Sequence, residues 1–344
     1  MIDTEPVGID PTAAGRWIES LGIQIAEPLR FERIGLGQSN LTYLITDGAQ
    51  RKWVLRRPPL GELLASAHDV VREARVLSAL AGTSVPVPQV IGVCRDVAVA
   101  EAPVVLMEYV DGLVVDRFPV AEALSASMRR SIGLSLARTL GRVHDIDLAA
   151  TGLVDLASHK PYAQRQLRRW SAQWERSKTR ELPLLEGLTR RLADAIPEQT
   201  DVTLVHGDFH LRNVIVSPDA GDVVAVLDWE LCTLGDPLAD LGSLLAYWRE
   251  PGESTQGGLA LSTVPGFPSR ADLVRAYVET TGRDPSALGY WHALGLWKLA
   301  IIAEGVLRRA LAEPQNKAAS GTPVIEQIDA IIDDADEVAT TAGI

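Results

Sequence analysis

Cysteine is scarce in this sequence, which has only Cys94 and Cys232 among 344 residues. Two isolated cysteines provide neither a disulfide framework nor the paired spacing of a zinc site, so we expect a cytoplasmic protein. An excess of positive charge is also lacking, because 45 acidic residues outnumber 33 Lys and Arg and leave a net charge of −12. Nucleic-acid phosphates select basic surfaces, so this balance argues against a nucleic-acid partner.

Long apolar runs are missing as well. The most apolar late segment, Ala293–Leu307, is interrupted by Lys298 and Glu304 and is shorter than the roughly 20 residues that a membrane span needs. The first fifteen residues have no charged region followed by an apolar stretch, so we expect no signal peptide. We therefore predict no membrane partner, and the sequence leaves the oligomeric state open.

The order of the predicted elements indicates an α+β fold. The first third contains strand-like segments separated by turn residues and one segment with helical spacing, and Pro58-Pro59 ends one of the strands. These segments are Leu29–Ile34, Leu41–Thr46, Arg51–Arg57, His68–Leu80 and Val104–Tyr109. After Asp111-Gly112 the pattern is mainly helical. We therefore predict a small β-rich domain over residues 1–110 and a larger, mainly helical one over 111–344.

The segment Leu204–Asp240 carries the most informative set of polar residues. Two short apolar runs flank a turn over residues 217–222, which predicts a β-hairpin. Asn213 precedes this hairpin, Asp228 follows it, and Asp208 lies five residues before Asn213. Magnesium takes oxygen ligands from one or two protein groups and leaves the others to water and phosphate. Asn213 and Asp228 fit that role, and Asp208 remains to accept a proton from an attacking hydroxyl.

These residues also carry a resemblance. The run His206–Asn213, followed by Leu227–Glu230, resembles the signature of the aminoglycoside phosphotransferase family, which is related to protein kinases. The resemblance implies a two-lobed protein-kinase-like fold, with an N-terminal nucleotide-binding lobe and a C-terminal catalytic and substrate-binding lobe, and the cofactors ATP and Mg2+. It implies that Asp208 is the catalytic base and that Asn213 and Asp228 bind the metal. His206 and Asp240 would support the catalytic loop.

The same resemblance identifies upstream residues that would bind ATP. A glycine-rich turn between two strands would cover the phosphates through Gly35, Gly37, Ser39 and Asn40. Arg56 stands where protein kinases place a phosphate-contacting lysine, and Glu73 stands where they place its ion-pair partner. Arginine in place of lysine is a departure from the pattern, and Arg57 is the competing candidate. Preference between ATP and GTP stays open.

The segment Met107–Val110 resembles the hinge of the family, in which the backbone of Glu108 and Val110 would contact adenine. An interior strand is the simpler interpretation of the same residues, and the two interpretations are compatible.

The acceptor is suggested by a basic segment. Residues 160–191 contain nine Lys or Arg and three Glu, and Arg165, Arg168 and Arg169 surround an apolar helix face. This helix is either a solvated amphipathic helix or an anion-binding rim beside the acceptor. The late helix that contains Trp297 would line the acceptor pocket or lie in the core.

The basic segment resembles the branch of the family that is associated with acyl-CoA dehydrogenases. So do Val54–Pro59, Ser66-Ala67-His68 and Gly266–Arg270. This branch implies that the small-molecule acceptor is a hydroxyacyl-CoA, phosphorylated on its chain hydroxyl. Two alternatives remain: an aminoglycoside- or macrolide-type antibiotic kinase, and a catalytically weak, pseudokinase-like module that binds nucleotide.

Overall fold

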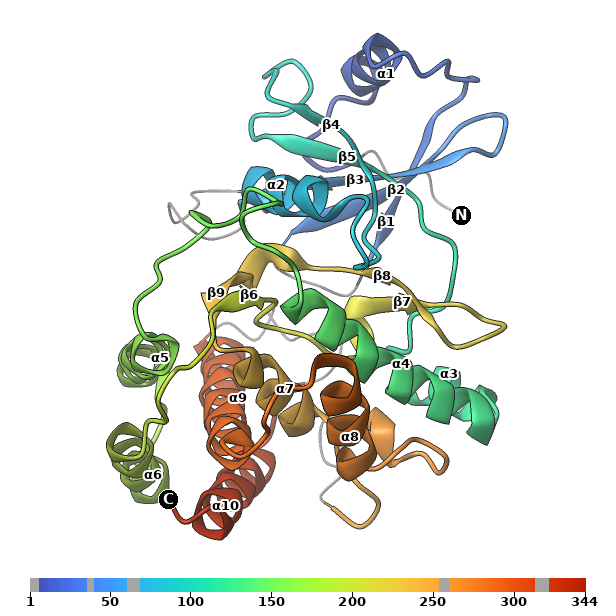
Figure 1. Ribbon diagram of the computed structural model, residues 1–344. Helices are drawn as coiled ribbons and strands as arrows, with labels where there is room; N and C mark the ends of the chain where they lie inside the picture. Colours follow the sequence, from blue (N-terminus) through green and yellow to red (C-terminus); the bar gives the residue numbers. More distant parts are fainter. Residues whose placement is uncertain (1–5, 36–39, 61–68, 254–259, 313–321) are drawn as a thin grey trace. The chain divides into compact units, whose positions relative to one another are not determined.

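The computed structural model describes residues 6–35, 40–60, 69–253, 260–312 and 322–344. The chain forms two compact units (Figure 1). The N-terminal unit comprises Met1–Asp111 and Val224–Glu230, and the C-terminal unit comprises Gly112–Val223 and Leu231–Ile344.

The N-terminal unit is built on a five-stranded antiparallel sheet with the order β1-β2-β3-β5-β4. Its strands are β1 (Arg30–Ile34), β2 (Leu41–Thr46), β3 (Lys52–Arg57), β4 (Val90–Cys94) and β5 (Val104–Glu108). The four strands expected from the sequence are confirmed within two residues, whereas β4 follows the proline-marked loop and was not predicted. Strand β3 ends at Arg57, because Pro58 and Pro59 follow it and proline cannot donate a hydrogen bond to the sheet.

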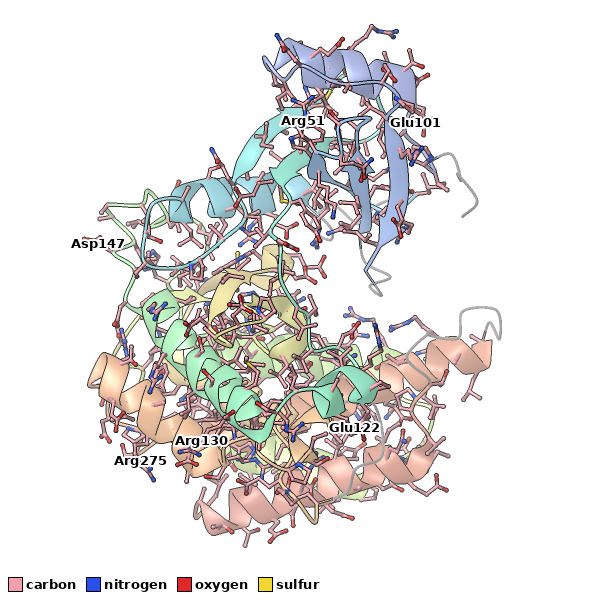
Figure 2. All side chains as sticks on the ribbon, turned by 90° about the vertical axis from the view of Figure 1, so that its right-hand side faces the viewer. Arg51, Glu101, Glu122, Arg130, Asp147 and Arg275 are labelled. Atoms are coloured by element: carbon pink, nitrogen blue, oxygen red, sulfur yellow. The ribbon has the colours of Figure 1, made fainter. Side chains whose placement is uncertain are left out.

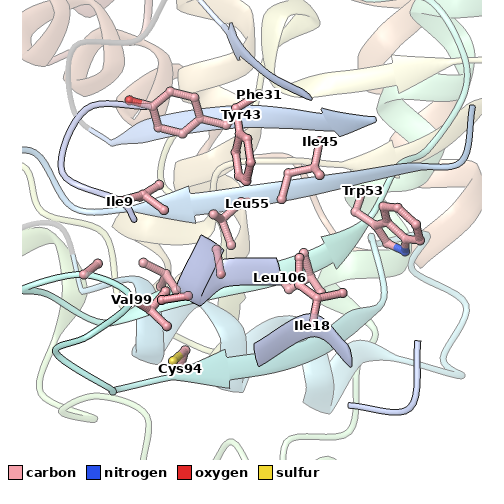
Figure 3. Packing of buried hydrophobic residues seen from close by; sticks show 14 residues of the cluster. Ile9, Ile18, Phe31, Tyr43, Ile45, Trp53, Leu55, Cys94, Val99 and Leu106 are labelled. Carbon is pink, nitrogen blue, oxygen red and sulfur yellow. The ribbon is translucent and has the colours of Figure 1, made fainter. Parts of the chain in front are cut away.

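Helix α1 (Pro11–Ser20) packs on one face of this sheet. Its first turn is capped by Asp10, which accepts a hydrogen bond from the Ala13 N–H at 2.7 Å. Ile18 of α1 is fully buried with Leu55 and Leu106 in the hydrophobic core, and Figure 3 shows these side chains together. Burial of such aliphatic side chains stabilises the unit by roughly 1.5–3 kcal/mol each.

Helix α2 (Val70–Leu80) contacts β4 and β5 and begins after Asp69, which caps its N-terminus. Successive side chains of a strand point to opposite faces of the sheet. Leu55 lies in the cluster with α1, so the next residue of β3, Arg56, points to the other face and reaches Glu73 of α2. Arg57 points back toward the first face, where its guanidinium donates to the Gly8 carbonyl.

The C-terminal unit is mainly helical. Its helices are α3 (Phe118–Ala123), α4 (Ala126–His144), α5 (Tyr162–Ser177), α6 (Pro183–Asp194), α7 (Pro237–Tyr247), α8 (Arg270–Thr281), α9 (Leu288–Ala312) and α10 (Ile325–Thr341). Strands β6 (Thr203–Val205) and β9 (Thr233–Gly235) pair antiparallel. Strands β7 (Val214–Val216) and β8 (Val223–Val226) form a two-stranded sheet, and the boundary between the two units, after Val223, falls within β8. The chain turns between these last strands where the Ser217 N–H donates to the Asp222 carbonyl at 2.8 Å. The expected hairpin is therefore confirmed.

Helix α9 is the central element of the C-terminal unit and contacts α5, α6, α7 and α10 (Figure 1). It crosses α7 at two glycines. A Cβ atom on Gly242 would lie 2.4 Å from the Trp291 backbone, and one on Gly295 would lie 3.0 Å from the Gly242 carbonyl oxygen. Glycine is required at this crossing because any side chain would separate the two helices.

Helix α8 packs against α4 and has an N-terminal capping box formed by Ser269 and Asp272. Asp272 also accepts hydrogen bonds from Arg130 of α4 at 3.2 Å and from Arg275 at 3.1 Å. Figure 2 shows these two arginines on the same side of the C-terminal unit. In the parts of the chain that the structure describes, no helix combines the length and apolar character needed to cross a membrane.

Candidate active site

The chain between β6 and β7 forms a loop whose backbone is held by Asp240 in the first turn of α7. The Asp240 carboxylate accepts hydrogen bonds from the His206 N–H at 2.6 Å and from the Gly207 N–H at 2.8 Å. Gly207 has φ +85°, and a Cβ atom there would lie 2.7 Å from the Leu231 carbonyl oxygen. Only glycine therefore allows the loop to approach this segment so closely.

Asp240 is itself supported from α4 and α8. His144 Nε2 lies 3.3 Å from Asp240 Oδ2, and His144 Nδ1 lies 2.8 Å from the Tyr277 hydroxyl. All three side chains are buried. Burial alone would raise the pKa of Asp240, but the hydrogen bond from His144 and the charges of His144 and His206 outweigh it and the pKa is lowered. This network keeps Asp240 ionised and fixes the start of the loop.

Asp208 follows Gly207, and three side chains contact its carboxylate. Tyr247 of α7 donates its hydroxyl to Oδ1 at 3.2 Å, Asn213 donates its amide to Oδ2 at 3.1 Å, and His210 Nε2 lies 3.4 Å from Oδ2. Burial would raise the pKa of Asp208, but His210, together with Lys298 and His206, holds it well below its ordinary value. The carboxylate is therefore ionised at neutral pH and oriented by its neighbours.

Asn213 is positioned so that its carbonyl oxygen is available. Its Nδ2 donates both to the Asp208 backbone carbonyl at 2.9 Å and to the Asp208 carboxylate. Since the amide nitrogen is occupied, Oδ1 is the free acceptor atom among the described contacts. An amide oxygen is a suitable ligand for Mg2+.

In the N-terminal unit, Asp228 and Glu73 flank Arg56. Arg56 Nη2 donates to Asp228 Oδ1 at 2.8 Å, and its Nε lies 3.1 Å from Glu73 Oε2. Glu73 also accepts a hydrogen bond from the Trp229 N–H at 3.2 Å, which ties the backbone after Asp228 to α2. Burial raises the pKa of Glu73 to about 7 despite the attraction of Arg56. The ion pair that the resemblance implied between Arg56 and Glu73 is therefore present.

Asp228 has φ +63°, which is unusual for a residue with a side chain. Such a conformation costs about 1–3 kcal/mol and is concentrated at functional sites. The Asp228 side chain is 31% exposed, and no hydrogen bond to its Oδ2 is found among the described residues. A hard cation can therefore reach this carboxylate, so its chemistry fits Mg2+.

The predicted ATP-binding residues are partly described. Gly35 follows β1 with φ +82°, whereas Gly37 and Ser39 lie outside the described residues, as does Ser66-Ala67-His68. Asn40 is buried and its Nδ2 donates to Glu230 Oε2 at 3.2 Å. Within the described structure, Asn40 Oδ1 is a buried acceptor without a hydrogen bond.

The predicted hinge lies at the end of β5. The Glu108 N–H donates to the Gln89 carbonyl at 2.9 Å, and Val110 follows the strand outside regular structure. Lys52 lies over the ring of Tyr109, with 4.9 Å between its Nζ and the ring centroid. Both interpretations of this segment, strand and hinge, stay compatible with these contacts.

Helix α5 buries Leu167 and Trp174 and exposes Arg168 and Arg169. Arg165 donates to the backbone carbonyls of Lys160 and Leu234. These three arginines form no ion pair with any carboxylate that the structure describes, whereas Arg180 and Arg191 of the same basic segment pair with Asp329 and Asp336.

The predicted acceptor residue Trp297 is buried, and its Nε1 donates to Thr189 Oγ1 at 2.8 Å. Together with Trp170, Trp291 and Lys298 it lines a cavity of about 20 Å³ between α5, α7 and α9. This volume accommodates roughly one water molecule, so Trp297 serves the packing of α9 in this structure.

Sequence reasoning missed several contacts of Asp208 and Asp240. Tyr247, His144 and Tyr277 lie on three different helices, and no local spacing connects them to the loop. Lys298 was identified as a charge in an apolar helix that could line the acceptor pocket, but not as a contact of the loop. Its Nζ donates to the Gly207 carbonyl at 2.9 Å. A single lysine within so apolar a segment was the one available signal, because a buried ammonium requires a partner.

Comparison with known proteins identifies the family of the chain. The model of the phosphotransferase enzyme family matches residues 30–287. Acyl-CoA dehydrogenase family member 10 of Mus musculus is 37% identical over 302 residues, which are 87% of this chain and 28% of that protein. Family member 11 of Homo sapiens is 32% identical over 300 residues, 86% of this chain and 38% of that protein. The chain thus spans about a third of the length of these relatives.

Solved structures show the same fold. A putative aminoglycoside phosphotransferase from Ralstonia eutropha is similar with a TM-score of 0.77 and 29% identity, covering 97% of this chain and 99% of that one. A variant of aminoglycoside phosphotransferase APH(4)-Ia, in a ternary complex with AMP-PNP and hygromycin B, has a TM-score of 0.60 at 14% identity, covering 96% and 99% of the two chains. The expected kinase-like α+β fold is confirmed, and the chain belongs to the phosphotransferase enzyme family.

Proposed function

We propose that this protein transfers the γ-phosphoryl group of ATP, with Mg2+, to a hydroxyl group of a small molecule, and that this acceptor is a hydroxyacyl-CoA. The observation that carries the proposal is the state of Asp208, whose carboxylate is ionised and held by Tyr247, Asn213 and His210. A fixed, ionised carboxylate at this motif position is what proton abstraction from an acceptor hydroxyl requires.

In this proposal Asp208 orients the acceptor hydroxyl and takes its proton as the new oxygen–phosphorus bond forms and the bond to ADP breaks. The Asp240 carboxylate keeps the loop in place by accepting hydrogen bonds from the backbone N–H groups of His206 and Gly207. Preorganised groups of this kind lower the barrier because they need no rearrangement during the reaction.

Two oxygen donors are candidates for the metal. Asn213 Oδ1 is left free by the bonds of its Nδ2, and Asp228 carries a partly exposed carboxylate. Bound Mg2+ would neutralise phosphate charge as it develops during transfer. Arg56, which pairs with Glu73 and Asp228, provides the cation on β3, and we propose that it contacts phosphate in place of lysine.

The remaining nucleotide contacts are proposed on motif position. Gly35 and Asn40 flank the glycine-rich turn, with Gly37 and Ser39 between them, and the backbone at Glu108 and Val110 would contact adenine. The buried Asn40 Oδ1 supports a polar role for this side chain, because a buried acceptor without a partner is unfavourable.

The acceptor class is supported by the charge of α5. Arg165, Arg168 and Arg169 have no carboxylate partner among the described residues, and two of them are exposed. Such a surface attracts the phosphates of coenzyme A and repels a cationic aminoglycoside. The similarity to two acyl-CoA dehydrogenase family members favours the same acceptor.

A screen of acceptors tests the proposal. The protein is incubated with Mg2+ and labelled ATP and with panels of hydroxyacyl-CoAs, aminoglycosides and macrolides, and the product masses are measured. We expect a mass increase of one phosphoryl group on a hydroxyacyl-CoA. If only an antibiotic is phosphorylated, the acceptor is an antibiotic and the hydroxyacyl-CoA proposal is wrong. Nucleotide binding without any phosphorylated product would favour a catalytically weak binding module.

A further inference from the structure

Lys298 is a cation within α9, a helix whose side chains are mostly buried and apolar. Its neighbours in α9, Trp297 and Leu299, are buried. Transfer of an ammonium group out of water is costly unless it finds charged or hydrogen-bonding partners. The contacts of Lys298 therefore identify what compensates this cost.

The first contact is to the catalytic loop. Lys298 Nζ donates to the Gly207 carbonyl at 2.9 Å, and this carbonyl belongs to the peptide group that joins Gly207 to Asp208. The N–H of the same peptide group donates to His206 Nδ1 at 3.3 Å. Gly207 has φ +85°, and glycine rotates more freely than other residues. Lys298 and His206 thus hold the two polar atoms of the peptide plane that directs the Asp208 side chain.

The second contact is to α5. Lys298 Nζ lies 5.4 Å from the centroid of the Trp170 ring, and the Arg169 guanidinium lies 5.4 Å from the same ring. A cation over an indole ring is attracted by about 0.5–2 kcal/mol. Trp170 is further fixed by the bond from its Nε1 to Gln166 Oε1 at 3.1 Å. One indole therefore connects the loop lysine with an exposed arginine of the basic helix.

We infer that Lys298 is a positioning residue for the proposed phosphotransfer, which fixes the direction of the Asp208 side chain through the Gly207 carbonyl and couples it to α5 through Trp170. The inference rests on the proposed function. Lys298 acts on the base through the backbone, and its charge also lowers the pKa of Asp208. Its loss therefore affects turnover and leaves nucleotide binding unchanged.

The test compares Lys298→Met, which keeps the length and apolar body of the side chain and removes its donors, with Lys298→Arg, which keeps the charge and donors. Lys178→Met is the matched control, because Lys178 pairs with Glu175 at 3.3 Å away from the loop. We expect Lys298→Met to lower kcat about 10- to 100-fold, the range that a small misplacement of a reacting group produces. KM for ATP should stay unchanged, and Lys298→Arg should recover most of the rate.

A second readout does not depend on activity. Amide hydrogen exchange of residues 206–213 should be faster in Lys298→Met than in Lys178→Met, because the Gly207–Asp208 peptide loses one of its two restraints. Should Lys298→Met fail to fold, Lys298→Gln takes its place with the same expected results.

Unchanged kcat and unchanged exchange in Lys298→Met would overturn the inference. A rise in acceptor KM alone, with kcat unchanged, would also overturn it and would make Lys298 an acceptor-binding residue. If the unmodified protein phosphorylates no acceptor, the proposed function fails, while faster exchange in Lys298→Met still supports the structural role of Lys298.

Discussion

Arg56 and Asp228 form an ion pair with 2.8 Å between Nη2 and Oδ1, although 172 positions separate them in the sequence. The same guanidinium pairs with Glu73 at 3.1 Å. One arginine therefore binds two carboxyl groups in the N-terminal unit. Its planar group reaches both at once, whereas the single ammonium of lysine is a point charge. This arrangement gives a physical reason for arginine at position 56, which we propose corresponds to the lysine of protein kinases.

Replacement of Arg56 by Met should destabilise the protein by about 3 kcal/mol or more, because the buried Glu73 would lose its cation. Arg56→Lys should cost less. Urea unfolding measures both values. The control is Arg95→Met, an exposed residue directly after β4, which should change stability by less than about 0.5 kcal/mol. A variant Arg56→Met as stable as the unmodified protein would contradict the importance of this pair.

Asp208→Asn should lower kcat by about 10²- to 10⁴-fold, the contribution typical of a general base. The affinity for nucleotide should stay the same, because Asp208 is not expected to bind the metal. Steady-state kinetics and calorimetry give these two quantities. Asp219→Asn, in the exposed turn between β7 and β8, is the control for the same chemical change. Full activity in Asp208→Asn would rule out the assigned base.

Asp228→Ala should abolish the dependence of ATP binding on Mg2+, because this carboxylate is the charged ligand proposed for the metal. Calorimetric titrations with Mg2+ and with chelator should give equal and weak affinities in the variant and different affinities in the unmodified protein. Since the variant also removes a partner of Arg56, its folding is checked by thermal unfolding. Retention of the Mg2+ dependence would assign the metal to other groups.

The sequence was sufficient to predict elements whose signal is local. The strand Leu41–Thr46 and the hairpin around residues 217–222 are found where the sequence predicts them, because strand alternation and turn residues lie within each segment. Strands β4 and β9 were missed. Strand β4 contains Gly92, near which its register with β5 shifts, and glycine weakens the strand signal. Strand β9 has three residues and exists because it pairs with β6, about thirty residues earlier, so its stability comes from a distant segment.

In the candidate site, too, the residues close together in sequence could be predicted, whereas those that reach the loop from other helices could not. Asp208 and Asn213 are joined by a spacing of five residues, and the structure brings their side chains to 3.1 Å. Tyr247 and Lys298 reach the loop from α7 and α9, and only the packing of those helices around Gly242 and Gly295 determines this approach. Sequence spacing alone contains no information of this kind.

Replacement of Arg168 and Arg169 by Gln should raise KM for a hydroxyacyl-CoA about tenfold or more, because charge-assisted hydrogen bonds to phosphate contribute about 1.5–3 kcal/mol each. KM for ATP should not change. The effect should decrease as salt is added, since exposed charges are screened. The control for net charge is the double variant Arg190→Gln/Arg191→Gln, at the end of the same basic segment, where Arg191 forms an ion pair with Asp336. Equal KM values for both double variants would exclude a specific role of α5.

Asp236 caps α7 by accepting a hydrogen bond from the Leu238 N–H at 2.9 Å. Burial raises the pKa of Asp236 to about 6, helped by the charge of Asp201 and opposed by Arg283. The folded protein therefore binds this proton more tightly than the unfolded chain does. As the pH rises from 4 to 6, this group should reduce the free energy of unfolding by on the order of 1–3 kcal/mol.

Asp236→Asn should remove this dependence, because asparagine caps a helix as well as aspartate and carries no charge. Urea unfolding between pH 4.5 and 7.5 should show that the stability of the unmodified protein falls relative to the variant as the pH rises. Asp272→Asn is the control, since hydrogen bonds from Arg130 lower the pKa of Asp272 and leave it ionised throughout this range. Parallel stability curves for Asp236→Asn and the unmodified protein would show that the α7 cap is already ionised at pH 4.5.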